Sequence, residues 1–437
     1  MVNNKFIKIF SLLFLVVGSI GISNAQSYDL NTFIQLVKKN NKDIKIAKNN
    51  IKIASTQSTE ASANAYPQLN GELSYRRNLK DNYLYLAMKA PGFPNKLKIN
   101  RNNEFGGQAV LSQILFNATV FNAIKASKQF ENLTDYTYQA TLQNVICAAK
   151  KAYYQTLLLK NVLQIKKDAE KSAHDNYIKI KNTYDSGLAS KLQLMQAEVR
   201  WKNSIPESLQ AKRNYKLALN TLKNLAGIDE NEPFEFAEEF GNIPRRPQLL
   251  DLKTALEQRP DYNAMVWERN LRETNISVEK SDFYPSLYAS LVYRYSALSD
   301  QFKLEDENNY LIAGLTMKIP IFSGFKRTAR VERAKIEVEQ TNLKIRKFEE
   351  KVDNELSNIA VRLDEALQRI SAAEATLKTA KQGFVITESS AENGLATQLE
   401  LKDSRLLFDQ AKLNYYAAIY DYLSAYFDWE LNMGIIK

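Results

Sequence analysis

The stretch VDNELSNIAVRLDEALQRISAAEATLKTAKQGF, residues 352–384, decides the fold class, because its apolar residues keep one helical spacing from end to end. They recur at alternating intervals of four and three residues over more than four heptads. This pattern predicts a helix that packs along its whole length against other helices. The ten positions are Val352, Leu356, Ile359, Leu363, Ala366, Ile370, Ala373, Leu377, Ala380 and Phe384.

The stretch is part of a much longer predicted helix, and further helices are predicted elsewhere in the chain. No proline occurs between residues 323 and 392, so the sequence predicts one helix over 323–392, on the order of 100 Å long. A weaker form of the same pattern predicts a second helix of similar length over 117–185. Pro206 is expected to kink or interrupt one of the shorter helices. These are predicted over 29–64, 190–225, 250–281 and 397–432.

The chain is internally duplicated. Asp43 and Tyr66-Pro67 recur as Asp261 and Tyr284-Pro285, in each case 218 residues later (261−43 and 284−66). Three later residues, 115–117, match residues 321–323 at an offset of 206 (321−115), so the first copy holds a loop about 12 residues longer (218−206). Such ordered landmarks indicate two copies of one structural unit.

Each copy reads as a helix, a strand pair, a very long helix, a glycine turn and a return helix. The first repeat is expected over 26–227, with its tip turn at residue 187 and its return helix ending near residue 225. The second is expected over 248–437, with its tip turn at residue 394 and its return helix ending near residue 432. A linker over 228–247, rich in Glu, Phe, Gly and Pro, joins the two repeats.

Each predicted strand pair alternates apolar and polar residues with a period of two. The pairs are expected at about 68–78 with 105–116, and at about 284–296 with 310–322. Strands of this length cross a bilayer when tilted, with one apolar and one polar face. Two ordinary half-buried hairpins are the alternative interpretation.

Four strands are too few to close a membrane barrel, because the smallest closed barrels have about eight. Open strand edges in hydrocarbon leave backbone groups unsatisfied, so several chains are expected to share one barrel. The polar face then lines a water-filled lumen. The lumen residues predicted from the sequence are Glu72, Arg76, Gln108, Arg294 and Lys318.

The composition excludes several classes of function. The chain of 437 residues has one cysteine, Cys147, and one histidine, His174, which leaves no ordinary zinc or redox-metal ligand set. It has no glycine-rich phosphate loop and no catalytic triad pattern, so we expect neither an enzyme nor a cofactor. The net charge of +10 is scattered rather than clustered, which argues against nucleic-acid binding.

The N-terminus has the pattern of a secretory signal peptide over residues 1–25. Lys5 and Lys8 precede an apolar run over 9–22, and small residues lead up to Ala25, where we expect cleavage. No cysteine follows at once, so lipidation there is not expected. A retained anchor is the alternative, but about 20 apolar residues are needed to span a membrane. The mature chain is therefore expected to cross a membrane as strands.

The order of these features is similar to that of the outer membrane efflux protein family, the TolC-like factors. The resemblance rests on the duplication, the two Tyr-Pro entries into strands, Arg259-Pro260-Asp261, the stretch 222–227 (LKNLAG) and the two glycine turns. It covers nearly the whole mature chain. It implies a mixed α and β membrane protein in the outer membrane of a Gram-negative bacterium. A homotrimer would share a twelve-stranded transmembrane β-barrel, continued by a long periplasmic α-helical coiled-coil barrel with an irregular belt that includes 228–247.

The resemblance also implies a role for the glycine turns. Gly187, Leu188, Gly394 and Leu395 would form the periplasmic tip, where the channel closes and a periplasmic adaptor (membrane fusion) protein docks. A sharp helix reversal often requires positive φ, which glycine adopts at little cost. A plain helical-hairpin turn with no docking role is the alternative.

Two acids follow the second turn. Glu400 and Asp403 lie three residues apart on one helix face, at the spacing from the glycine where the family carries an acidic pore constriction. Repelling carboxylates there would make closure depend on pH or divalent ions. A solvated helix face is the alternative. Gln193 in the first copy and Ala396 in the second depart from the family pattern, which puts a salt-bridge latch in doubt.

These features predict a passive outer-membrane exit duct of a tripartite efflux or type I secretion system. Its partners would be the adaptor, an inner-membrane transporter and outer-membrane lipid. A wide duct selects little, so the choice among drugs, metals, peptides and proteins would rest with the transporter. The alternative from a different class is a periplasmic coiled-coil scaffold or adhesin without a pore.

Overall fold

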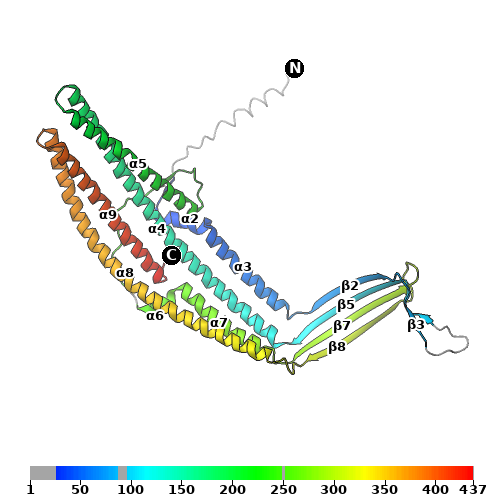
Figure 1. Ribbon diagram of the computed structural model, residues 1–437. Helices are drawn as coiled ribbons and strands as arrows, with labels where there is room; N and C mark the ends of the chain where they lie inside the picture. The colour runs from blue at the N-terminus through cyan, green and yellow to red at the C-terminus, as the bar shows by residue number, and fades with distance from the viewer. Residues whose placement is uncertain (1–25, 87–95, 249–250, 437) are drawn as a thin grey trace, which may run out of the picture. The chain divides into compact units, whose positions relative to one another are not determined.

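The computed structural model describes residues 26–86, 96–248 and 251–436 (Figure 1). They form two compact units, and each unit draws on both halves of the chain. One unit comprises 139–259 and 350–437 with the N-terminal residues up to Ala47, and the other comprises 48–138 and 260–349. Three helices, α3, α4 and α8, contribute residues to both units. Their bounds are Lys42–Ala63, Ala118–Asp185 and Lys326–Glu392.

Two helical hairpins dominate the first unit. The C-terminal part of α4 returns as α5, and the C-terminal part of α8 returns as α9 (Figure 1). The predicted apolar stripe is the buried face of α8: Val352, Ile359 and Leu363 are at most 2% exposed. The other elements of this unit are β1 (Gln26–Tyr28), α2 (Leu30–Asn40), α5 (Lys191–Ala226), β6 (Phe234–Phe236), α6 (Leu252–Gln258) and α9 (Gln398–Asn432).

An aromatic cluster fixes the linker to the first unit. β6 pairs in parallel with β1, so the stretch 228–247 is not irregular throughout. Phe234 stacks on Tyr28, and Phe236 lies edge-on to Tyr153. The Tyr153 hydroxyl donates to the carbonyl of Tyr28 at 2.8 Å, so the buried phenol has its partner.

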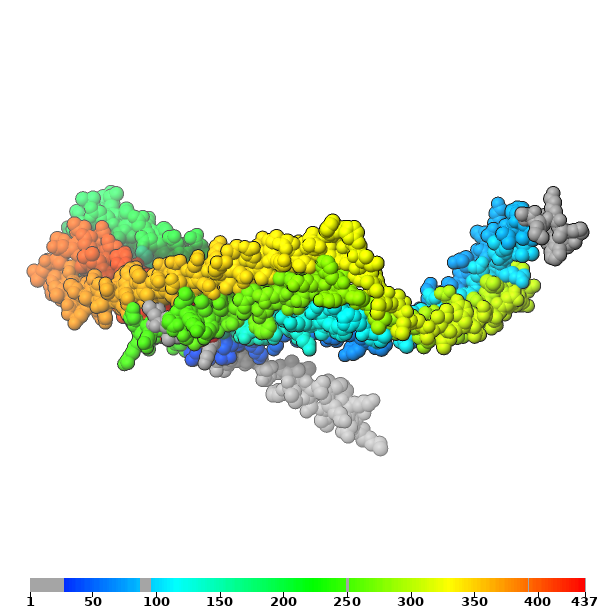
Figure 2. Space-filling model, turned by 90° about the horizontal axis from the view of Figure 1, so that it is seen from below, coloured from blue at the N-terminus to red at the C-terminus, as the bar shows by residue number. Residues whose placement is uncertain are grey.

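The second unit contains a four-stranded antiparallel sheet in the order β2-β5-β7-β8. No described helix of this unit covers it (Figure 2), and the residues of β2 and nearly all of those of β8 are exposed. Among the described strands, β2 and β8 form the open edges. The strands of this unit are β2 (Gln68–Arg77), β3 (Tyr83–Tyr85), β4 (Lys96–Lys98), β5 (Asn103–Phe116), β7 (Ser286–Ser299) and β8 (Asn308–Lys318), and its further helix is α7 (Pro260–Ser281).

Two of the predicted shorter helices are each divided in two. Asn41 ends α2 with extended backbone, and its side-chain oxygen accepts from the N–H groups of Asp43 and Ile44, which caps α3. Arg259 likewise separates α6 from α7, because the residue before a proline disfavours helical backbone, whereas Pro260 suits a first helical position.

Pro206 does not interrupt its helix, so that part of the prediction was wrong. α5 runs without a break from Lys191 to Ala226. The carbonyl that loses its N–H partner belongs to Lys202, and both Lys202 and Pro206 are exposed. Water can therefore satisfy that carbonyl, which lowers the cost of the proline.

The predicted signal peptide, residues 1–25, lies outside the described residues.

Candidate functional site

The first helix tip is a tight glycine reversal at the end of α4. Gly187 has φ +75°, and its N–H donates to the carbonyl of Tyr184 at 2.8 Å. The N–H of Leu188 reaches back to the carbonyl of Thr183 at 2.9 Å. This pair of bonds satisfies carbonyls that the helix end would otherwise leave free, and it requires the left-handed conformation that glycine adopts at little cost.

The second tip repeats the same geometry. Gly394 has φ +73° and donates to Ala391 at 3.2 Å, and Leu395 donates to Ser390 at 2.8 Å. The leucines after the two glycines, Leu188 and Leu395, are 83% and 84% exposed. Two large apolar side chains are therefore exposed at equivalent positions in the described chain.

Each tip then starts its return helix with a capping box. Ser190 accepts from the Gln193 N–H, and the Gln193 side chain accepts from the Ser190 N–H at 2.8 Å. Thr397 and Glu400 make the same reciprocal pair, with the Glu400 carboxylate accepting from the Thr397 N–H at 2.7 Å. Gln193 thus has the same local role as Glu400.

The two predicted constriction acids differ in their surroundings. The backbone N–H and hydroxyl of Thr397 lower the pKa of Glu400, because both donate to its carboxylate. Asp403 is exposed, and its nearest ion-pair partner is its neighbour Lys402 at 3.9 Å. Burial lowers the pKa of Arg200 on α5, and the negative charge of Asp403 acts against that shift. Of these two acids, Asp403 is therefore the one whose charge acts on a residue of the other hairpin.

A groove of about 810 Å³ lies beside the tips, lined by α4, α5, α8 and α9. On its wall Arg405 binds Asp409 at 3.0 Å and lies 5.2 Å from the centre of the Phe384 ring. Phe384 stacks in turn on Phe408. Burial raises the pKa of Asp409, while the bond to Arg405 acts in the opposite direction.

A chain of polar contacts crosses one face of the sheet. Gln108 donates to Glu72 at 2.6 Å, and Arg294 donates to Gln108 at 3.1 Å. Arg294 also donates to the hydroxyl of Tyr310 at 3.2 Å. These four residues are direct partners in register on β2, β5, β7 and β8. The sequence analysis predicted three of them but not Tyr310. Its place opposite Arg294 in the predicted hairpin was the signal that could have identified it.

Arg76 and Lys318 lie on the same face by register but away from this chain of contacts. Arg76 pairs with Glu104 on β5 at 3.3 Å, a partner that the sequence analysis did not name. Lys318 lies opposite Ser286 at the other end of the sheet. The opposite face carries mainly apolar side chains, so the predicted alternation separates a polar from an apolar surface.

Within the described ranges there is no group of three or more His, Cys, Asp or Glu residues placed to hold a metal ion. Cys147 is buried, and burial raises its pKa to about 11. His174 packs against Trp201, with ring centres 4.8 Å apart. None of the helices in the described part of the chain combines the length and the apolar character that a membrane span requires.

Comparison with known proteins gives consistent matches along the chain. The family model described as "Outer membrane efflux protein" matches residues 33–228 and 252–428. Outer membrane protein TolC of Vibrio cholerae is 22% identical over 82% of this chain and 79% of its own length. Alkaline protease secretion protein AprF of Pseudomonas aeruginosa is 20% identical over 75% and 69%. Cation efflux system protein CusC of Escherichia coli is 23% identical over 87% and 80%.

Solved structures share the fold. The CmeC outer membrane channel of Campylobacter jejuni superposes with a TM-score of 0.77 at 19% identity, covering 93% of this chain and 86% of that one. A structure of CusC superposes with a TM-score of 0.73 at 19% identity, covering 96% and 95%.

Proposed function

Because this chain belongs to the outer membrane efflux protein family, we propose that it forms the outer-membrane exit duct of a tripartite efflux or type I secretion system. It is an outer membrane protein whose helices extend into the periplasm. In the proposal three copies share one twelve-stranded barrel, and their helical hairpins continue it as a coiled-coil conduit. An adaptor and an inner-membrane transporter supply cargo and energy.

The observation that carries this proposal is the open, two-faced sheet. β2 and β8 have no partner on their outer edges among the described strands, and backbone groups left unpaired in lipid cost several kcal/mol each. Four strands from each of three chains would close the wall. Closure would turn the polar face, with Glu72, Gln108 and Arg294, toward a water-filled lumen.

The tips support the periplasmic half of the proposal. Exposed Leu188 and Leu395 follow identical glycine reversals, which gives a trimer a ring of similar apolar contacts for an adaptor. We place the acidic constriction mainly at Asp403, because the Glu400 carboxylate already closes a capping box. Like charges around a narrow axis would repel each other and attract cations.

The names of the relatives span two kinds of cargo: a secreted protease for AprF and cations for CusC. A passive duct suits both, because in the proposal the choice of cargo rests with the inner-membrane transporter. The competing function, a periplasmic scaffold or adhesin, predicts soluble hairpins and no pore.

The first test is the protein mass, corrected for detergent by light scattering, of the complex extracted from outer membranes. We expect three chains, and in planar bilayers the same sample should show a low resting conductance. Asp403→Asn should raise this conductance several-fold, whereas Glu400→Gln, which preserves the capping box as Gln193 does, should change it little. A soluble monomer without conductance would support the scaffold instead.

A further inference from the structure

A groove of about 420 Å³ lies on the apolar face of the sheet, near the strand ends at Arg77, Asn103 and Ser299. These ends lead into the connections 78–102 and 300–307, away from the strand ends that join the helices. Eight residues line the groove. Ser74 and Gly106 do so from positions between residues of the apolar face, and Leu304 comes from the connection 300–307. The other five share the apolar face: Leu73, Tyr75, Phe105, Gly107 and Tyr295.

Gly107 lines the groove without a side chain of its own. It lies in register between Leu73 and Tyr295. A Cβ added there would lie 3.2 Å from a terminal methyl group of Leu73. In the next row Tyr75 and Phe105 pack together, and Phe302 lies edge-on to both rings at 5.4 Å. The groove therefore has an apolar floor and an aromatic end.

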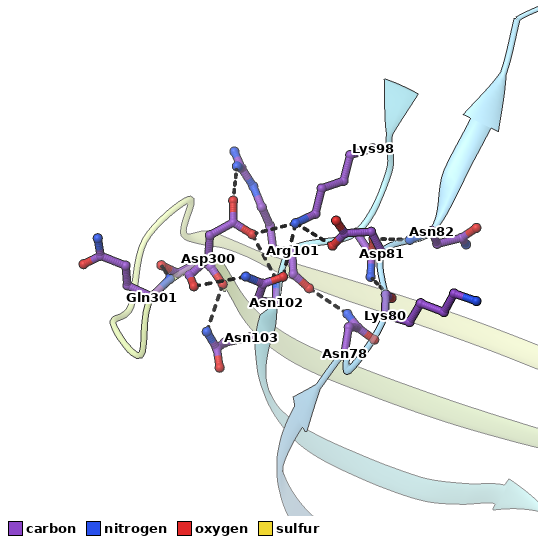
Figure 3. Close-up of polar contacts among 12 residues, drawn as sticks. Asn78, Lys80, Asp81, Asn82, Lys98, Arg101, Asn102, Asn103, Asp300 and Gln301 are labelled. Atoms are coloured by element: carbon purple, nitrogen blue, oxygen red, sulfur yellow. Dashed lines mark hydrogen bonds and ion pairs between the residues drawn. The ribbon is translucent and has the colours of Figure 1, made fainter. Parts of the chain in front are cut away.

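The connection that carries Phe302 and Leu304 is held in place by polar contacts (Figure 3). Asp300 accepts from Lys98 at 3.3 Å, from Arg101 at 3.0 Å and from the N–H of Asn102 at 3.1 Å. Arg101 also pairs with Asp306 at 3.0 Å. The rim of the groove is thus anchored to both halves of the chain, which is what a preformed site requires.

Two cations beside the groove have no partner among the described residues. Arg77 lies on the apolar face two residues beyond Tyr75, roughly 7 Å along the strand, and it is exposed. Lys303 stands between Phe302 and Leu304 and is also exposed.

The carboxylates of the same connection, by contrast, are all engaged. Asp300 and Asp306 bind cations, Glu305 accepts from Ser299, and Glu307 accepts from Tyr295. An apolar groove with unpaired positive charge beside it is complementary to a lipid with an anionic headgroup.

We propose that this groove holds an acyl chain of a phosphorylated glycolipid of the outer leaflet, of the lipid A class, with Arg77 and Lys303 on its phosphate. The inference rests on the proposed function, because only a membrane-embedded barrel turns the apolar face toward lipid. The helices then mark the periplasmic end of the strands, so the groove lies at the level of the outer leaflet. The long stems of Arg77 and Lys303 can follow the apolar surface while their charges reach the headgroup layer.

The test is native mass spectrometry of the detergent-extracted trimer, titrated with diphosphoryl lipid A, monophosphoryl lipid A and phosphatidylcholine. Gly107→Leu fills the groove and should abolish retention of diphosphoryl lipid A. Gly71→Leu is the matched control, because Gly71 lies on the same face but a Cβ there meets no atom within 4 Å. Equal loss of lipid in both variants would overturn the site.

The headgroup is tested separately. Arg77→Gln with Lys303→Gln should lower the affinity for diphosphoryl lipid A on the order of tenfold or more. The affinity for monophosphoryl lipid A should fall less, and that for phosphatidylcholine should hardly change. Arg76→Gln removes the neighbouring charge from the opposite face and should leave the lipid affinity unchanged. Equal affinity of the unmodified protein for all three lipids would overturn the phosphate contact.

Mass and conductance measured on the same samples distinguish the two proposals. A conducting trimer that binds lipid A no better than phosphatidylcholine would overturn this inference but would still support the proposed exit duct. A soluble monomer would overturn both.

Discussion

Glu400 and Gln193 occupy equivalent places in the two tips, and each closes a capping box. Their difference is chemical: the amide accepts its hydrogen bond at any pH, whereas the carboxylate accepts strongly only when ionised. Because the pKa of Glu400 is lowered in the folded tip, its contribution is present above the ordinary value of 4.5. That contribution is lost as the pH falls through the lowered pKa.

We therefore predict that acid loosens only the second tip. As the pH falls below 4.5 and through the lowered pKa of Glu400, the amide protection factors of Thr397 and Glu400, measured by hydrogen exchange, should fall several-fold relative to those of Ser190 and Gln193. Glu400→Gln should remove this difference. An equal loss of protection at both tips would contradict the assignment.

Residue roles were only partly predictable from the sequence. The alternation of the strands was enough to place Glu72, Gln108 and Arg294 on one face. The Thr-x-x-Glu signature of a capping box was also present at Thr397 and Glu400. The sequence analysis instead assigned Glu400 to an acidic constriction, because of the family resemblance. Partners such as Glu104 depend on register between strands, which a single sequence does not supply.

Each half of the chain has a close backbone contact after its return helix. Gly227 caps α5 beside Asn40, and Gly434 follows the end of α9 beside Gln258. The two pairs are equivalent, since they are related by the offsets 207 (434−227) and 218 (258−40). A Cβ at Gly434 would lie 2.5 Å from the carbonyl oxygen of Gln258, which belongs to the backbone and cannot rotate away.

Gly434→Ala should therefore lower the free energy of unfolding by about 2–4 kcal/mol, through the clash and the positive φ. Gly227→Ala should cost less, because its closest contact is a side-chain atom of Asn40 at 2.9 Å. Gly241→Ala is the control, with open space around it and an expected change within about 0.5 kcal/mol. Denaturant titration of the detergent-solubilised protein gives the order, and equal values for all three would refute the packing argument.

Element types followed from periodicity, but element ends did not. The apolar spacing through Ile34, Val37, Ile44 and Ala47 continues across the break at Asn41, so periodicity alone predicts one helix. The break is made by the hydrogen bonds of one amide side chain. The proline after Arg259 correctly marks the break between α6 and α7. Pro206, by contrast, led to a predicted interruption that does not occur.

At the scale of the whole molecule, the sequence predicted that the four strands of one chain are too few to close a membrane barrel. The structure adds the order of the sheet, in which β5 of the first half pairs with β7 of the second (Figure 1). No local pattern specifies that pairing, because strands β2, β5, β7 and β8 all show the same alternation. The pairing of β5 with β7 therefore depends on the fold of the whole chain.

The seam between β5 and β7 joins the two halves of the duplicated chain. Each half supplies one similar hairpin of strands, so the proposed wall of three chains would be a ring of six half-chains. A chain of half the length would need six identical copies for the same wall, with one tip sequence for all. In the duplicated chain the two tips can differ, and they do: one has the neutral Gln193 and the other the ionisable Glu400. A ring in which two kinds of tip alternate could respond to two different stimuli, whereas a ring of six identical tips could respond to only one.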